Sequence, residues 1–420
     1  MFTTLPKMQK ELETYKTELQ QELEAILAYW IKYAVDEEYG GFAGRIDNSN
    51  NIDKEAPKGS VLNSRILWTF SAAFNLRGNP SYLKMAERAF RYIADYFIDK
   101  EHGGVYWTVD YKGAPLDTKK QIYALSFAIY GLSEYYRASQ NEEAKRLAID
   151  LYEAVVAHSY DKENGGYIEA LTRDWTEMDD IRLSAKDANE RKSMNTHLHV
   201  LEGFANLYHI WPDAMLKQRI VELLQIFPER IIDAKTNHLV LFFDDEWNPK
   251  GNIQSYGHDI EAAWLLQEAA EAIGEKELIE KIKQCSIQLA DAATKGLDMD
   301  GGLWYEYDGN EKHLVREKHW WPQAEAMVGY FNVWQLTGEE TYLEKSLNGW
   351  QFIKNHLLDK ENGEWYWGVT QQYSVMKGQD KVGIWKCPYH NGRACIEIIR
   401  RISSMRPFLK PLINKISNHN

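Results

Sequence analysis

The sequence predicts an all-α fold, an (α/α)6 barrel of twelve helices built from six helix–hairpin–helix units with short β-hairpins at one end. Two observations carry this prediction. An acidic turn, followed by glycine and a short aromatic or β-branched run, recurs along the 420 residues. The segments on either side of each turn have the hydrophobic periodicity of helices. The composition, 44% hydrophobic and 26% charged, is typical of a globular chain.

An aspartate marks the turn in every unit. Five copies read VDEEYGGF, DKEHGGVYW, DKENGGYIE, DMDGGLWYE and DKENGEWYW, and a degenerate copy, DAKTNHLVLFF, lacks the glycine pair. The markers are Asp36, Asp99, Asp161, Asp233, Asp298 and Asp359, at spacings of 63, 62, 72, 65 and 61 residues. No Pro/Gly/Ser-rich linker separates the units, so we expect residues 1–420 to form a single catalytic domain.

Unit two shows the elements of one repeat in order. Before Asp99, five apolar residues recur at the spacing of one buried helical stripe and predict an outer helix: Ala86, Ala89, Phe90, Ile93 and Phe97. After it, GGVYWTVDYKG alternates with period two and predicts a hairpin. The segment from Gln121 is apolar nearly all round, which is typical of a buried inner helix. We expect the six units to close into a ring because the terminal ones lack an obviously polar capping face.

Charge and cysteine content exclude several classes of function. A net charge of −13 with no basic stripe argues against nucleic-acid and membrane partners. Three cysteines without CxxC spacing suit a reducing cytoplasm. The N-terminal segment has no apolar signal region and no run of 18 apolar residues occurs, so we expect a cytoplasmic protein. Phosphate-binding glycine motifs are absent too, which leaves NTP or NAD dependence unsupported.

Unusual polar and aromatic residues gather where each loop enters its inner helix, at six junctions that would surround one cavity. They include Arg65, Tyr123, Asn195, His199, Glu202, His258, Asp259, Glu261, Trp321, Glu325, Trp385, His390 and Arg393. His258 and Glu261 are three residues apart, so the carboxylate could hold the imidazole and raise its basicity. Several imidazoles that converge with Arg, Glu and Trp indicate proton transfer on a polar, ring-shaped substrate.

The same histidines also allow a structural or a metal-binding interpretation. A lone histidine on an apolar helix is usually a satisfied core or rim residue, and His197 and His319 are interpreted in that way. His197 and His199 lie two positions apart on a helix and diverge, so they cannot share one metal ion. No HExxH or EF-hand motif occurs, and the sequence predicts no metal.

Four junction motifs, MNTHLHVLEGF, YGHDIEAAWLL, HWWPQAEAM and WKCPYHNGR, resemble the N-acylglucosamine 2-epimerase superfamily. The PYHN sequence in the last motif resembles its cellobiose 2-epimerase branch. The resemblance implies epimerisation at C2 of the reducing-end glucose or mannose of β-1,4-linked disaccharides, with no cofactor and a small oligosaccharide as the substrate. The alternatives are a monosaccharide N-acylglucosamine 2-epimerase, a mannose-type aldose–ketose isomerase, a glycoside hydrolase on the same barrel, and a sugar-binding protein without activity.

The resemblance also implies roles for individual residues. His390 and His258 would be the acid/base pair that works through an enediolate, Glu261 would support His258, and His199 would assist ring opening.

The substrate would be bound by a second group of residues. Arg65, Tyr123 and Asn195 would bind the reducing-end hydroxyls and the enediolate oxygen. Trp321 and Trp385 would stack on the sugars, and because they come from consecutive units we expect them to lie side by side along the cleft.

Overall fold

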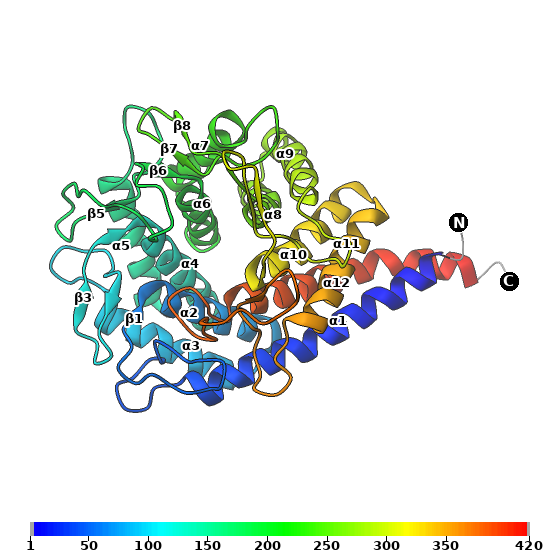
Figure 1. Cartoon of the computed structure of the whole chain (residues 1–420), viewed down its shortest axis with the longest axis horizontal. Helices are drawn as coiled ribbons and strands as arrows, with labels where there is room; N and C mark the ends of the chain where they lie inside the picture. The colour runs from blue at the N-terminus through cyan, green and yellow to red at the C-terminus, as the bar shows by residue number, and fades with distance from the viewer. Residues whose placement is uncertain (1–3, 418–420) are drawn as a thin grey trace.

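The computed structural model describes residues 4–417, which contain twelve α-helices that alternate between an outer and an inner layer (Figure 1). The outer helices are α1 (Thr4–Tyr29), α3 (Pro80–Tyr92), α5 (Glu142–His158), α7 (Ala214–Ile226), α9 (Lys276–Thr294) and α11 (Glu340–His356). The inner helices are α2 (Ser60–Arg77), α4 (Ile122–Ser139), α6 (Met194–Tyr208), α8 (Tyr256–Ile273), α10 (Trp320–Thr337) and α12 (Tyr389–Ser417). Each inner helix packs against the next, and α12 packs against α2, so the ring closes. The predicted (α/α)6 barrel is confirmed.

The two layers differ in burial as the hydrophobic pattern predicts. The first fourteen residues of α4 are all buried, because neighbouring inner helices and α5 cover it. On α3 a narrow stripe is buried, and the predicted positions Ala86, Ala89 and Phe90 all belong to it. The α-helix is shorter than predicted, because Ile93–Phe97 forms a π-helical turn, η2. Equivalent π turns, η1 (Trp30–Ala34) and η3 (Phe227–Ile231), end α1 and α7.

Short strands connect neighbouring units. They are β1 (Lys58–Gly59), β2 (Thr108–Val109), β3 (Pro115–Asp117), β4 (Lys120–Gln121), β5 (Ala170–Leu171), β6 (Lys192–Ser193), β7 (Phe242–Phe243), β8 (Pro249–Lys250), β9 (Ile253–Ser255), β10 (Glu306–Asp308), β11 (His313–Val315), β12 (Lys318–His319) and β13 (Gly368–Val369). The strand before each inner helix pairs with a strand of the next unit: β1 with β2, β4 with β5, β6 with β7, β9 with β10, and β12 with β13.

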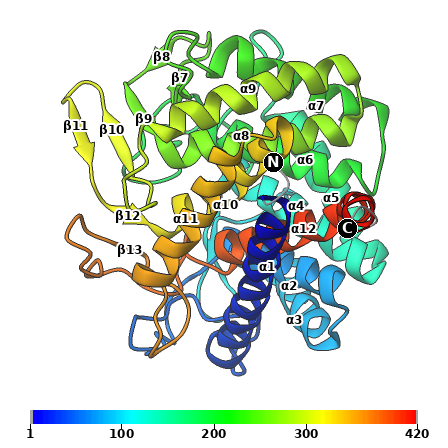
Figure 2. The ribbon, with the colours of Figure 1, turned by 90° about the vertical axis from the view of Figure 1, so that its right-hand side faces the viewer.

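A bridge between Ile46 and Val382 joins the last unit to the first, so the strands close the ring as the helices do. Figure 2 shows β7 to β13 gathered on one side of the helices, which is the predicted common end for the loops. Within residues 4–417 no helix is long and apolar enough to cross a membrane.

A buried lysine stands two residues before the first residue of an inner helix in four of the six units. Its ammonium group binds the marker aspartate of the same unit: Lys58 to Asp36 at 2.6 Å, Lys120 to Asp99 at 2.8 Å, Lys192 to Asp161 at 2.7 Å, and Lys318 to Asp298 at 2.7 Å. In unit six Lys381 binds Asp359 at 2.6 Å, and a second lysine, Lys386, binds Glu364 at 3.2 Å. These ion pairs tie each turn to the helix that follows it.

Unit four departs from this pattern, as its degenerate turn indicates. Gln254 replaces the lysine. The turn itself is kept, because Ile232 and Leu239 form the same β-bridge as their counterparts. Asn237 takes the place of the first glycine at φ 60°, a left-handed conformation that asparagine tolerates better than most residues. The missing glycine pair therefore changes the chemistry of this turn more than its shape.

Removal of one buried lysine should destabilise the fold. Lys381 and Asp359 have side-chain exposures of 0% and 1%, and Lys381→Met would leave a buried carboxylate without its counter-ion. We expect a loss of about 3–5 kcal/mol in the free energy of unfolding, measured by urea denaturation. Lys54→Met is the matched control, because the Lys54–Glu38 pair is 4.0 Å long and exposed, and it should cost less than about 1 kcal/mol. Equal losses in the two variants would contradict a structural role for the buried pair.

Candidate active site

Six side chains from the inner helices occupy equivalent positions near the loop end of the barrel. Each follows seven residues after the buried lysine of its unit, or after Gln254 in unit four. They are Arg65, Phe127, His199, Glu261, Glu325 and Arg393. All six are buried. The repeat thus places one side chain from every unit in a single ring, and five of the six are polar.

Arg393 is the centre of a buried charge cluster. Its guanidinium donates to Glu261 at 2.9 Å, to Glu325 at 2.6 Å, and to Glu202 and the Tyr389 hydroxyl. Burial opposes the ionisation of Glu325, but Arg393 outweighs it and holds the pKa of that carboxyl low. Burial, together with Glu325, raises the pKa of Glu261 to about 8. One guanidinium thus faces three carboxyl groups, and Glu261 is the one whose ionisation its surroundings oppose.

His258 and His390 are each held by one ring nitrogen. His390 Nδ1 lies 2.6 Å from Glu325 Oε1, and His258 Nδ1 lies 2.8 Å from Ser255 Oγ. Both rings contact Trp321, with centroid distances of 4.7 Å for His258 and 5.7 Å for His390. Burial lowers the pKa of each histidine to about 3, which favours the neutral form of each ring.

The predicted contact between Glu261 and His258 is wrong. Glu261 binds Arg393, and the residue that holds His258 is Ser255, which lies three positions earlier in the chain. The i, i+3 spacing allowed the expected contact, but a buried guanidinium competes for the carboxylate more strongly than a neutral imidazole does.

His199 belongs to the same cluster. Its Nδ1 lies 2.8 Å from Glu202 Oε2, as their shared helix face allows, and its ring packs edge-on against Tyr123 at 5.0 Å. Burial lowers the pKa of His199 despite the neighbouring Glu202. Among residues 4–417, Nε2 of His199, His258 and His390 has no hydrogen-bonding partner. Three neutral imidazoles are thus fixed at one nitrogen and free at the other.

Arg65 differs from Arg393 in its surroundings. It donates to the Tyr123 hydroxyl at 2.7 Å and to the Trp385 carbonyl at 3.3 Å, and it lies 4.2 Å from the centre of the Phe127 ring. No carboxylate in the described part of the chain pairs with it. Asn195, nearby in the repeat pattern, has a buried Oδ1 without a partner. A cation without a counter-ion and an unsatisfied amide are both available to a polar ligand.

The two junctional tryptophans lie on different walls. Trp321 packs against His258 and His390, whereas Trp385 packs against Tyr123 at 6.1 Å and against Trp107 at 5.7 Å. The expectation that they lie side by side is not met, because the loop that carries Trp385 turns toward units one and two.

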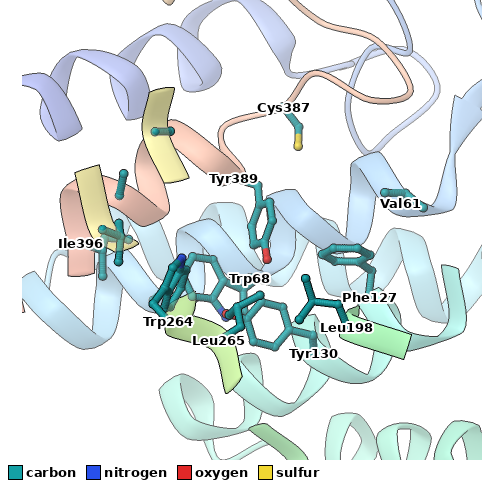
Figure 3. Packing of buried hydrophobic residues seen from close by; sticks show 14 of the residues in the cluster. Val61, Trp68, Phe127, Tyr130, Leu198, Trp264, Leu265, Cys387, Tyr389 and Ile396 are labelled. Atoms are coloured by element: carbon teal, nitrogen blue, oxygen red, sulfur yellow. The ribbon is translucent and has the colours of Figure 1, made fainter. Parts of the chain in front are cut away.

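Large rings form the floor beneath these polar groups. Figure 3 shows Tyr389 and Phe127 close to Tyr130 and Trp68, and the ring centroids of Tyr389 lie 5.4 Å from Phe127 and 5.6 Å from Trp68. Trp264 donates its indole N–H to Glu325 at 2.9 Å. A floor of this kind excludes water and strengthens the electrostatic interactions above it.

The amino-acid sequence matches a known protein family. The profile of the N-acylglucosamine 2-epimerase (GlcNAc 2-epimerase) family matches residues 40–393. The chain belongs to this family. It is 51% identical to a cellobiose 2-epimerase of Bacteroides fragilis over 92% of this chain and 99% of the relative, and 38% identical to one of Dictyoglomus turgidum over 93% and 100%.

A solved structure of cellobiose 2-epimerase from Bacillus thermoamylovorans is also similar, with a TM-score of 0.89 and 39% identity over 93% of this chain and all of that one. The predicted class, a cellobiose 2-epimerase-like isomerase that acts on carbohydrates, is therefore confirmed.

Three other junction residues of this epimerase family member stand outside the cluster. His197 is satisfied at both nitrogens, by the Ser193 carbonyl at 2.7 Å and the Tyr167 N–H at 2.9 Å. Asp259 holds His238 at 2.6 Å. His319 lies 2.9 Å from Glu317 and stacks on a tyrosine at the rim. The structural interpretation of His197 and His319 is supported by these contacts.

Neither Nδ1 partner of the two histidines is among the sequence-based predictions. These partners are Glu325 for His390 and Ser255 for His258. The register could have indicated Glu325, because it shares the position of His199, seven residues after a lysine, and of Glu261, seven residues after Gln254. Ser255 had the weaker signal of a hydroxyl three residues before a histidine.

One group of side chains has the spacing of a metal site. Ligand atoms of Glu261, Glu325 and His390 lie within 4.8 Å of one another. Arg393 already donates to both carboxylates, so a guanidinium supplies the positive charge there. This donor set does not fit a resident metal ion.

His197 should make the fold less stable in mild acid. Burial lowers its pKa to about 4, so below the ordinary value of about 6.5 the unfolded chain takes up a proton that the folded one refuses. Stability from this group is complete above pH 6.5 and is lost as the pH falls toward 4. Between pH 7 and pH 5, the free energy of unfolding measured with urea should fall by about 2 kcal/mol less in His197→Gln than in the wild type.

Glutamine suits this position, because Gln323 of unit five accepts the Leu303 N–H from the equivalent site at 2.6 Å. Equal pH dependence in the variant and the wild type would show that His197 titrates normally.

Proposed function

We propose that this protein, as one catalytic domain spanning residues 1–420, epimerises C2 of the reducing-end sugar of β-1,4-linked disaccharides. Cellobiose would become glucosyl-mannose and lactose would become epilactose. The observation that carries this proposal is the pair of imidazoles, His258 and His390, which come from different helices, flank Trp321 and each have a free Nε2. Membership of the family and the names of the relatives support the same reaction.

The sugar ring must open first, because the C2 proton is acidic only when C1 is an aldehyde. His199, held by Glu202 at 2.8 Å, is suited to move a proton between the ring oxygen and the anomeric hydroxyl. Asn195 and the Tyr123 hydroxyl would bind the hydroxyl groups of the opened chain.

Removal of the C2 proton then generates an enediolate. Its negative charge needs a fixed cation or hydrogen-bond donor, and Arg65 supplies both without a competing carboxylate. Arg393 cannot serve, because its positive charge is already balanced by the three glutamates. The two arginines therefore have separate tasks, Arg65 toward the substrate and Arg393 within the scaffold.

Inversion requires the proton to return on the opposite face of C2. Two imidazoles on either side of the carbon can do this, one as base and the other as acid. Return of the proton to C1 would give the ketose, so isomerisation is the expected side reaction and the mannose-type isomerase is the main alternative.

Hydrolysis is less well supported. A glycosidase needs two carboxyl groups that face the scissile bond. Glu202, Glu261 and Glu325 are all bound to Arg393, and no other pair of carboxylates belongs to the described cluster.

The reaction can be tested by NMR of cellobiose incubated with the protein in D2O. Epimerisation gives glucosyl-mannose with deuterium at C2, isomerisation gives a ketose, hydrolysis gives glucose, and a binding protein leaves the sugar unchanged. We expect the first result, with losses of about 10²–10⁴-fold in His258→Ala and His390→Ala. His313→Ala, on the exposed strand β11, is the control and should keep wild-type activity. Near-normal rates in either active-site variant would refute the assignment of these histidines.

Trp385 should favour disaccharides over monosaccharides. It packs against Trp107 on the neighbouring hairpin, away from the two histidines, and so could stack on the second sugar. We expect Trp385→Ala to lower kcat/KM for cellobiose by about 10-fold or more and to change kcat/KM for mannose much less, by analogy with stacking energies of about 1–3 kcal/mol. Wild-type protein should prefer cellobiose to mannose and to N-acetylmannosamine. A preference for either monosaccharide would favour the alternative branch.

A further inference from the structure

His258 and His390 are equivalent in the repeat but have different partners. Each lies three residues before a residue of the polar ring, Glu261 and Arg393 respectively. The Nδ1 partner of His390 is a carboxylate, Glu325, whereas the Nδ1 partner of His258 is a hydroxyl, Ser255. Both partners are buried, with Ser255 and Glu325 each 1% exposed.

The carboxylate of Glu325 restricts neutral His390 to one tautomer. Glu325 accepts hydrogen bonds from Arg393 at 2.6 Å and from Trp264 at 2.9 Å, which is the environment of an ionised group. An ionised carboxylate only accepts, so the proton of neutral His390 must be on Nδ1 and its Nε2 must carry the lone pair. The negative charge also stabilises the imidazolium that forms when Nε2 takes a proton.

The hydroxyl acts differently on His258. Ser255 Oγ can accept from Nδ1–H in the neutral ring or in the imidazolium, so it fixes the orientation of the ring without adding charge. The other charged or titratable groups that act on His258 are His199, His390 and Glu325, and neither of the two histidines favours a second proton nearby. His258 therefore lacks the directly bonded carboxylate that favours a second proton on His390, although Arg65 and Arg393 oppose that proton.

We propose that Ser255 is the positioning residue for His258, the counterpart of Glu325 for His390, and that the two histidines on opposite faces of C2 therefore depend on different partners. The assignment rests on the proposed epimerase function. It adds that each histidine can be disabled separately through its own partner.

The proton transfers balance without another reagent. One neutral imidazole takes the C2 proton on its Nε2, while the electrons of the C–H bond form the C1–C2 double bond and the carbonyl electrons move to O1. The other histidine, as imidazolium, gives its Nε2 proton to the opposite face of C2, and the carbonyl forms again. After one turnover the two histidines have exchanged protonation states. The reverse reaction restores the original states. When turnover runs in one direction only, proton exchange with water restores them between turnovers.

Exchange of the C2 proton for deuterium can be measured separately for each epimer, and it reports on the histidine that faces that proton. In D2O, one histidine alone can remove the C2 proton and return a deuteron to the same face without inversion. Ser255→Ala should lower epimerisation at least 10-fold, together with C2 exchange in the epimer whose proton faces His258. Exchange in the other epimer should stay within about 3-fold of the wild type, because the His390–Glu325 pair is intact. Glu325→Gln should show the opposite pattern, and Ser255→Thr, which keeps the hydroxyl, should recover most of the epimerisation.

A matched control distinguishes positioning from general damage. Ser193 occupies the equivalent place before α6, where its hydroxyl donates to Glu169 at 2.6 Å and caps the helix through the Thr196 N–H. Ser193→Ala should lower Tm but leave both exchange rates in the wild-type ratio. If Ser255→Ala epimerises at the wild-type rate, or loses exchange equally in both epimers, the assignment of Ser255 is overturned. If the wild-type protein epimerises no sugar at C2, the proposed function fails first and this inference fails with it.

Discussion

The structure depends on a buried ion pair between a lysine and the acidic turn of its unit. An ammonium group in the interior is costly unless a carboxylate and further acceptors surround it. The repeat satisfies this demand: Lys58 binds Asp36 and the Gly40 carbonyl, and Lys192 binds Asp161 and the Asp245 carbonyl. In four of the six units the lysine lies two residues before the inner helix, so the pair fixes where that helix begins. It thereby fixes the height of every side chain on the helix's first two turns.

The ring of six equivalent side chains (Arg65, Phe127, His199, Glu261, Glu325 and Arg393) is a direct consequence of these common helix starts. Six helices that begin at one level bring six equivalent side chains to one level, and the repeat does not dictate their chemistry. This sequence places one arginine among three glutamates and another arginine with none, so nearly equivalent positions have opposite electrostatic roles. His258 and His390 also hold equivalent positions, but Nδ1 of His258 contacts a hydroxyl and Nδ1 of His390 contacts a carboxylate.

Much of the fold could be predicted because it is local and repeated. The spacing of the acidic turns, the narrow stripe of α3 and the all-round apolar character of α4 each report on one unit, and six copies reinforce one another. The junction residues could be listed for the same reason. Their partners were harder to predict: spacing brought His258 near Glu261, but Arg393, 132 residues away in the chain, takes that carboxylate. A side chain's choice between a local and a distant partner depends on burial and charge, which the spacing along one helix does not contain.

The sequence by itself determined the architecture, the family and the set of residues at the mouth of the barrel, since these follow from periodicity and from motifs within single units. Only the tertiary structure decided which of those residues meet. In the folded chain Trp321 and Trp385 pack against different neighbours. Glu325 contacts His390 and Ser255 contacts His258. Arg65 binds the Tyr123 hydroxyl and pairs with no carboxylate of the described residues. The physical reason is that closing the ring brings distant units within hydrogen-bonding distance. Buried charges there pair with the strongest partner in space and not with the nearest one in the chain.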